Sequence, residues 1–143
     1  MKRFAVLGLI LGSALIFSAG PSKLSAQVCK DDEGMVAEYT KSVTDLVDTV
    51  KKESLEDFTK AFHQKTVASK LTFYGTMVDS LITCLQKSAN NPATEKADAD
   101  AAKAKIERYN KLKDQIKQDR DALKAAQTEK DAKSLIEKFS YVV

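Results

Sequence analysis

The chain has 143 residues, of which 43% are hydrophobic and 30% are charged, and its formal net charge is +3. Three basic residues, Lys2, Arg3 and Lys23, lie in an N-terminal segment without acids, so the remainder holds 20 basic and 20 acidic residues. A neutral chain lacks the positive field that nucleic-acid binding and polybasic membrane attachment require, and this excludes both classes of function.

The first 26 residues have the three zones of a secretory signal peptide. Met1-Lys2-Arg3 is a basic start, residues 4–17 are almost entirely apolar, and small residues then lead to Ala26. We expect cleavage after Ala26, which leaves residues 27–143 as one helical domain in the periplasm or outside the cell. An uncleaved anchor is the alternative, but an apolar run of about 14 residues is short against the about 20 of a spanning helix.

Cys29 gives a third interpretation, a lipoprotein that is acylated at this cysteine and anchored in the envelope. A bacterial lipoprotein carries a small residue directly before the acylated cysteine, whereas Val28 stands here, well past the apolar run. We therefore expect contact with a membrane only if Cys29 is lipidated.

After the leader the composition is that of a helical protein. Beyond residue 26 the sequence has two glycines, Gly34 and Gly75, one proline, Pro92, and many Ala, Lys, Glu and Leu residues, which favour helix. We predict an all-α fold, an antiparallel helical hairpin extended to a three- or four-helix bundle, with helices at about 33–52, 55–87, 95–127 and 129–139.

The first helix is predicted from one apolar stripe with helical spacing. The acids at 31–33 precede it and suit the positive end of a helix dipole. The stripe consists of Val36, Tyr39, Val43, Leu46, Val47 and Val50.

The second helix begins at a capping-box pattern, Ser54 with Asp57. The apolar phase slips after Phe62, so we expect a kink or a turn at about 63–66. A heptad-like series follows, and a second apolar line runs beside it. Since a helix with two apolar faces lies between two neighbours, we expect this helix to be central. The series is Val67, Leu71, Tyr74, Val78, Leu81 and Leu85, and the second line is Phe73, Met77 and Cys84.

Residues 88–94 contain Asn-Asn-Pro, a turn signal, and Thr94 is the expected cap of the third helix. Thr128 would cap a short last helix. The apolar tail that follows it, residues 141–143, either folds back on the bundle or stays exposed for a partner. The stripe of the third helix is Ala99, Ala102, Ile106, Tyr109, Leu112, Ile116, Leu123 and Ala126.

The two cysteines of the exported chain, Cys29 and Cys84, predict one intramolecular disulfide. The midpoint between them falls beside the Ser54 cap, so a chain reversal there places both cysteines at the open end of the hairpin. Closing such a long loop is worth about 3–4 kcal/mol in the chain-entropy treatment.

We find no motif for catalysis, a metal or a cofactor. His63 is the single histidine, which argues against a multi-histidine metal site, and we interpret it as a hinge or surface residue. Tyr39, Tyr74 and Tyr109 each lie in the apolar stripe of a different helix. They are expected either to pack in the core or to line a pocket for a small ligand.

These observations predict a non-enzymatic protein that acts through protein–protein interaction in the cell envelope or outside the cell, as a scaffold or an adhesin does. A protein partner of unknown identity is expected, and a homo-oligomer is compatible with the heptad-like stripes. The alternative is a periplasmic carrier or sensor of a small apolar ligand, suggested by the tyrosines. An enzyme centred on His63 has the least support.

Overall fold

The computed structural model describes residues 29–142, so the predicted leader and its cleavage after Ala26 lie outside the described residues. This part of the chain is an all-α bundle, as predicted, and contains no strand. Its five helices are α1 (Lys30–Lys52), α2 (Leu55–Lys60), α3 (His63–Ala89), α4 (Lys96–Ala125) and α5 (Glu129–Ile136).

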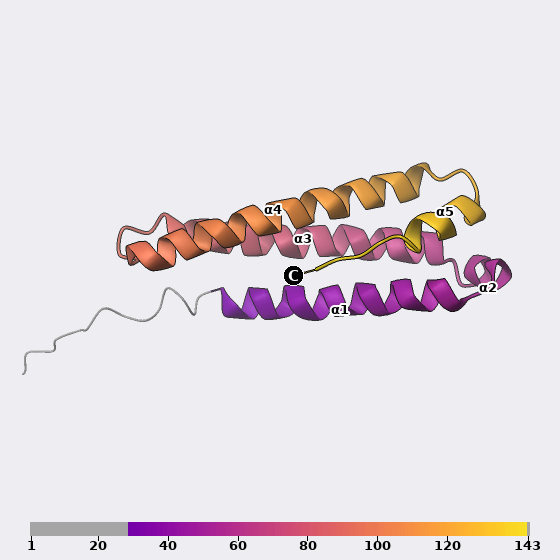
Figure 1. Cartoon of the computed structure of the whole chain (residues 1–143), viewed down its shortest axis with the longest axis horizontal. Helices are drawn as coiled ribbons and strands as arrows, with labels where there is room; N and C mark the ends of the chain where they lie inside the picture. Colours follow the sequence, from indigo (N-terminus) through magenta and orange to yellow (C-terminus); the bar gives the residue numbers. More distant parts are fainter. Residues whose placement is uncertain (1–28, 143) are drawn as a thin grey trace, which may run out of the picture.

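Three long helices give the bundle its elongated shape (Figure 1). The central one is α3, which packs against α1 on one side and against α4 on the other. The chain reverses between α1 and α3, so these two form the predicted antiparallel hairpin. The short helices α2 and α5 lie together at the end where this reversal occurs.

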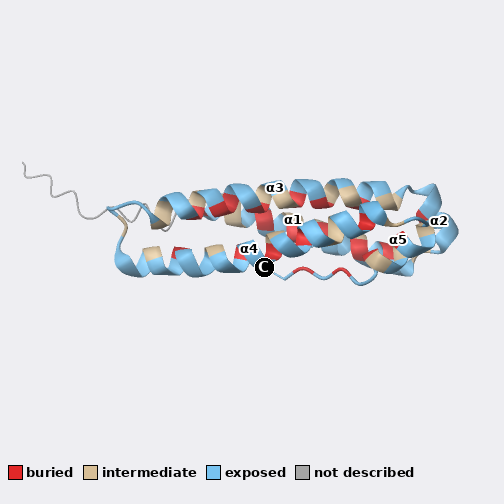
Figure 2. Cartoon of the chain, turned by 90° about the horizontal axis from the view of Figure 1, so that it is seen from above, coloured by how far each residue is buried: buried red, intermediate tan, exposed pale blue. Residues whose placement is uncertain are grey.

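The core is built from the stripes that the sequence shows, and Figure 2 marks their buried positions along the helices. Burying large aliphatic and aromatic side chains is the main driving force for this packing. The side chains with at most 2% exposure include Val36, Val43, Val47, Val50, Val67, Leu71, Tyr74, Val78, Leu81, Tyr109, Ile116 and Leu123.

The predicted second helix is divided in two. A break at Ala61 and Phe62 separates α2 from α3, just before the range 63–66 in which we expected a kink. Phe62 has φ 53° and ψ 37°, a left-handed conformation that a bulky side chain rarely adopts. The slip in the apolar phase thus indicates that the helix is broken, but the residue with the strained conformation, Phe62, lies just before the predicted range 63–66.

Two predicted caps are present and one has another role. Ser54 Oγ accepts from the Asp57 amide at 3.1 Å, and Thr128 Oγ1 accepts from the Asp131 amide at 3.1 Å. Thr94 does not cap α4. Its hydroxyl donates to the Ser88 carbonyl at 2.8 Å, which also accepts from the Asn91 amide at 3.3 Å, so it helps to close the end of α3.

The C-terminal segment 137–142 folds back on the bundle, which is the first of the two predicted alternatives. It runs along the groove between α1 and α4 (Figure 1). Phe139 and Tyr141 are buried there, and Gln115 Nε2 donates to the Ser140 carbonyl at 2.8 Å. No helix within 29–142 is long and apolar enough to cross a membrane.

Candidate interaction surface

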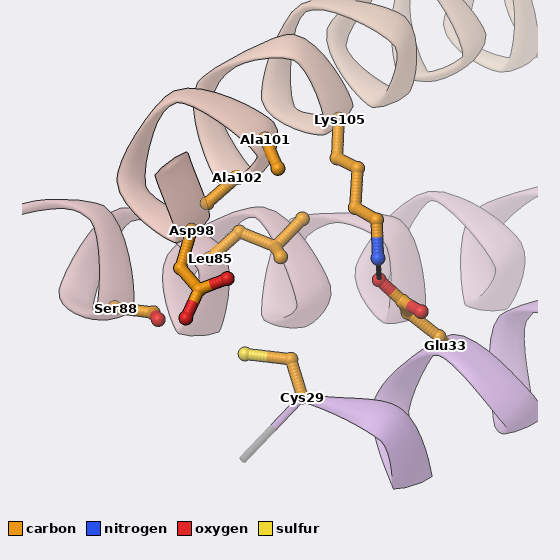
Figure 3. Close-up of a pocket in the computed structure, with 8 residues that line it drawn as sticks. All are labelled: Cys29, Glu33, Leu85, Ser88, Asp98, Ala101, Ala102 and Lys105. Atoms are coloured by element: carbon orange, nitrogen blue, oxygen red, sulfur yellow. Dashed lines mark hydrogen bonds and ion pairs between the residues drawn. The ribbon is translucent and has the colours of Figure 1, made fainter. Parts of the chain in front are cut away.

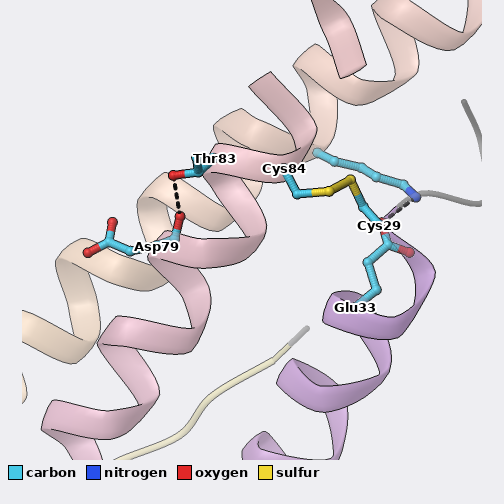
Figure 4. Close-up of a disulfide and its surroundings, with 6 residues drawn as sticks. Cys29, Glu33, Asp79, Thr83 and Cys84 are labelled. Carbon is cyan, nitrogen blue, oxygen red and sulfur yellow. Dashed lines mark hydrogen bonds and ion pairs between the residues drawn. A yellow bond between two sulfur atoms is a disulfide. The ribbon is translucent and has the colours of Figure 1, made fainter. Parts of the chain in front are cut away.

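A disulfide joins Cys29 and Cys84, as predicted (Figure 4). It links the residue that precedes α1 to the last third of α3, with 6.0 Å between the two Cα atoms. At the other end of the hairpin, His63 Nε2 lies 2.8 Å from Glu53 Oε2. The α1–α3 pair is therefore tied at both ends, and His63, the weak enzymatic candidate, has a structural contact.

Two of the three predicted tyrosines, Tyr74 and Tyr109, are in the core, and Tyr39 packs against the edge of the core beside Tyr74. Tyr74 and Tyr109 are 0% and 2% exposed, and Tyr39 is half-buried with its ring centroid 5.9 Å from that of Tyr74. The Tyr74 hydroxyl is hydrogen-bonded to Thr40. Burial raises the pKa of Tyr74 above its usual value, and this bond lowers it by less. Packing in the core was one of the two roles predicted for these tyrosines; lining a ligand pocket was the other.

A fourth tyrosine, which the sequence interpretation missed, completes this cluster. Tyr141 packs edge-on against Tyr74, with ring centroids 5.6 Å apart, and its hydroxyl donates to Asp119 Oδ2 at 2.8 Å. Burial raises the pKa of the Asp119 carboxyl, and the Tyr141 bond lowers it by less. The apolar character of the tail indicated that Tyr141 could be buried. The spacing of apolar residues does not show which helices a segment contacts when it folds back.

A small pocket lies beside the disulfide, between the start of α1 and the first turns of α4 (Figure 3). Leu85 and Ala102 line it, and the ion pair of Glu33 with Lys105, 2.6 Å long, bridges α1 and α4. Its volume is about 90 Å³, which suits a few waters and falls short of the roughly 300 Å³ of small-molecule sites.

Large apolar side chains remain exposed on one face of the α1–α3 pair, which we call the outer face. Phe62 and Phe73 are each 66% exposed, and Met35 is 48% exposed. Phe62 is the residue before α3 and precedes Phe73 by about three helical turns. Half-buried Tyr39, Leu46 and Met77 continue the same two helical stripes. The outer face therefore consists of Met35, Tyr39, Leu46, Phe62, Phe73 and Met77.

Neither α4 nor the C-terminal segment covers this face. The contacts of α3 with α4 involve other positions: a Cβ on Gly75 would lie 3.8 Å from Ile116, and Asp79 pairs with Lys113. Of the predicted second apolar line, Cys84 is bonded to Cys29 at the start of α1 and Met77 is half-buried against the core, whereas Phe73 stays exposed. Tyr39 and Phe73 instead line a shallow hollow together with Lys65 and Lys70.

The two edges of the outer face differ in charge, except that Lys52, the last exposed residue of the α1 edge, is basic. On α1, Asp31, Glu38 and Asp45 recur every seven residues and are exposed; this spacing keeps them on one edge of the helix. On α3, Lys65 and Lys87 line the hollows beside Phe73 and Cys84. None of these six charged side chains forms an ion pair with another residue in 29–142.

No protein family matches the chain, and no curated protein or solved structure is found to be similar to it.

Proposed function

We propose that this chain is an exported, non-enzymatic helical protein that acts by binding another protein through its outer face, in the cell envelope or outside the cell. A scaffold or an adhesin works in this way. The observation that carries the proposal is the pair of phenylalanines, Phe62 and Phe73, each 66% exposed on a helix pair that is tied at both ends.

Physical chemistry supports a binding role for these two side chains. A phenylalanine that is mostly exposed contributes little to the core, and clustered exposed apolar groups mark interaction sites. Aromatic residues are also enriched among the side chains that dominate binding energy. A tied pair loses little conformational freedom on binding, so more of the contact energy appears as affinity.

Export is supported by two independent features. The first 26 residues have the pattern of a signal peptide, and the Cys29–Cys84 bond is of a type that persists in oxidising compartments. The alternative function, a carrier of a small apolar ligand, has less support because Tyr74 and Tyr109 are packed in the core.

The proposal is tested by the size of the native assembly. After gentle extraction from the compartment that holds the protein, we expect it to run well above the mass of a single chain, which is 15.7 kDa before the leader is removed. Phe73→Ser should return it to the size of the free chain. Val142→Ser is the matched control, because Val142 is 82% exposed but lies in the C-terminal segment.

If the wild-type protein runs as a free chain, or if the assembly is unchanged by Phe73→Ser, the outer face is not the binding surface. Thermal unfolding of both variants shows whether they remain folded. Since Phe73 contributes little to the core, its replacement should leave the melting temperature nearly unchanged.

A further inference from the structure

We propose that the partner on the outer face is a second copy of this chain, and that two copies form a symmetric dimer in which α1 of each packs on α3 of the other. This inference rests on the proposed function, since it uses the same face. It adds the identity of the occupant and the relative orientation of the two chains.

The size of the outer face suits a dimer. α1 has 23 residues, which at about 1.5 Å per residue extend over about 35 Å. Two helices side by side present a width of about 20 Å. The resulting area of about 700 Å² per copy is close to the about 800 Å² that each partner buries in a specific interface.

The centre and the rim of the face have the composition of an interface. Tyr39 and Phe73 lie together near the middle of the face, with Met35 and Phe62 towards its two ends, and aromatic residues and methionine are enriched in protein interfaces. The short side chains Thr66 and Ser69 line the hollow beside Phe73 and leave room for an aromatic ring from outside. Lys70 lies inside this hollow, with its Nζ 5.4 Å from the Tyr39 ring centroid, and the charged residues named above stand at the rim.

Charge complementarity selects the orientation. The α1 edge carries Asp31, Glu38 and Asp45, and the α3 edge carries Lys65 and Lys87. A two-fold axis parallel to the helices sets α1 of one copy against α3 of the other, acid against base. A two-fold axis across the helices would set α1 against α1, acid against acid, which costs binding energy.

The antiparallel pairing within the chain gives the register. Tyr39 packs against Tyr74 with the two rings tilted by 37°, and Ser42 accepts from Lys70 at 2.8 Å. Asp45 therefore lies at the level of residues just before Lys70. With the axis parallel to the helices, this places Asp45 of one copy close to Lys65 of the second copy. The two-fold axis makes this pair twice.

A membrane surface is a poorer occupant of the same face. Anionic lipids attract lysines but repel carboxylates, and the α1 edge would bring three carboxylates against the headgroups. A second copy suits both edges at once, because the acidic edge of each copy lies against the basic edge of the other.

The test uses two charge-reversal variants of the oxidised chain, expressed with its own leader. Asp45→Lys places a lysine against Lys65 of the second copy, and Lys65→Asp places two carboxylates together. Each homodimer then has two repulsive contacts. We expect the dissociation constant of each, measured by analytical ultracentrifugation, to be at least about tenfold higher than that of the wild type.

The decisive step is to mix the two variants. In a mixed dimer, the lysine introduced by Asp45→Lys meets the carboxylate introduced by Lys65→Asp in the other chain, and the unchanged Lys65 meets the unchanged Asp45. Both contacts are attractive, so the mixture should regain wild-type association that neither variant shows alone. Asp114→Lys and Lys117→Asp on α4, both at exposed positions, are the matched controls and should dimerise like the wild type.

A wild-type chain that stays monomeric up to about millimolar concentration would overturn the dimer, as would variants that associate as well as the wild type. Mixing without recovery would overturn this orientation. Sedimentation of a monomeric wild type with anionic vesicles would assign the face to a membrane. A monomeric purified chain that still enters a Phe73-dependent native assembly would leave the proposed function standing and identify the partner as another protein.

Discussion

At the scale of single residues, Phe62 lowers the stability of the fold and is placed in the proposed binding surface. Its left-handed backbone costs a non-glycine residue roughly 1–2 kcal/mol, and its side chain is 66% exposed, so packing does not offset this cost. Strained residues persist where function requires them. In this chain Phe62 belongs to the outer face, which accounts for an aromatic residue where Asn or Gly would be more stable.

We predict that Phe62→Asn stabilises the monomer and weakens association. Asn tolerates the left-handed region, so the free energy of unfolding should rise by about 0.5–1 kcal/mol, measured by urea denaturation of the oxidised chain. The dissociation constant of the assembly should rise in the same variant. A loss of stability in Phe62→Asn would mean that the phenyl ring packs inside the fold.

Asp119 and Tyr141 lead to a prediction about pH. Burial raises the pKa of the folded Asp119 carboxyl above its usual value, so the folded chain holds this proton more tightly than the unfolded chain does. The charged carboxylate therefore costs stability at neutral pH, and this cost disappears as the pH falls through the raised pKa towards the unfolded value.

Tyr141→Phe removes the hydrogen bond that partly lowers the Asp119 pKa. That pKa should rise further, which a carboxyl-detected NMR titration would measure. The loss of stability should be about 1 kcal/mol at pH 7 and smaller near pH 3–4, because a bond to a charged acceptor is worth more than a bond to a neutral one. An unchanged Asp119 titration in Tyr141→Phe would contradict the contact.

At the scale of helices, periodicity was sufficient to predict the hairpin, the central helix and the disulfide. The buried stripes of α1 and α3 are helical repeats of Val, Leu and Tyr, and two antiparallel stripes of similar length leave Cys29 opposite Cys84. Each of these results follows from local spacing and from the reversal at Ser54.

Three features could not be predicted, because they depend on contacts between distant segments. The phase slip near 63–66 did not reveal that Phe62 itself takes the strained conformation. The hydroxyl of Thr94 was assigned to the wrong helix end. The second apolar line was expected to meet a neighbouring helix, and Cys84 does so through its bond to Cys29, but Phe73 of the same line stays exposed.

The disulfide should act as a single stabilising unit. The cysteines are 55 residues apart, so its removal should cost about 3–4 kcal/mol. Cys29→Ser, Cys84→Ser and the double variant should lose equal amounts, because each lacks the same bond. Hydrogen exchange should show the loss first in the initial turns of α1, which the bond holds against α3.

The same residues distinguish a disulfide from a lipid anchor. The intact mass of the native protein should correspond to a start at Gln27 and should increase by two hydrogens on reduction. A mass that starts at Cys29 with added acyl chains would identify a lipoprotein and exclude the intramolecular bond, and Cys84→Ser would then leave stability unchanged.

At the scale of the whole molecule, the fold leaves two faces with different characters. On one, α5 and the C-terminal segment close the groove between α1 and α4 and bury Phe139 and Tyr141 (Figure 1). On the other, the outer face of the α1–α3 pair remains open, with an apolar centre and edges of opposite charge. The chain outside the leader has no net charge, so specific contacts rather than a general field must select the partner.

The most direct test is a photoreactive amino acid at position 73, activated where the protein works, with position 107 as the control. Glu107 is exposed on α4, away from the outer face. We expect a specific protein adduct from position 73 and none from position 107, with an adduct of twice the chain mass if the partner is a second copy. Equal labelling at both positions, or none at position 73, would contradict the claim that this protein acts through the outer face.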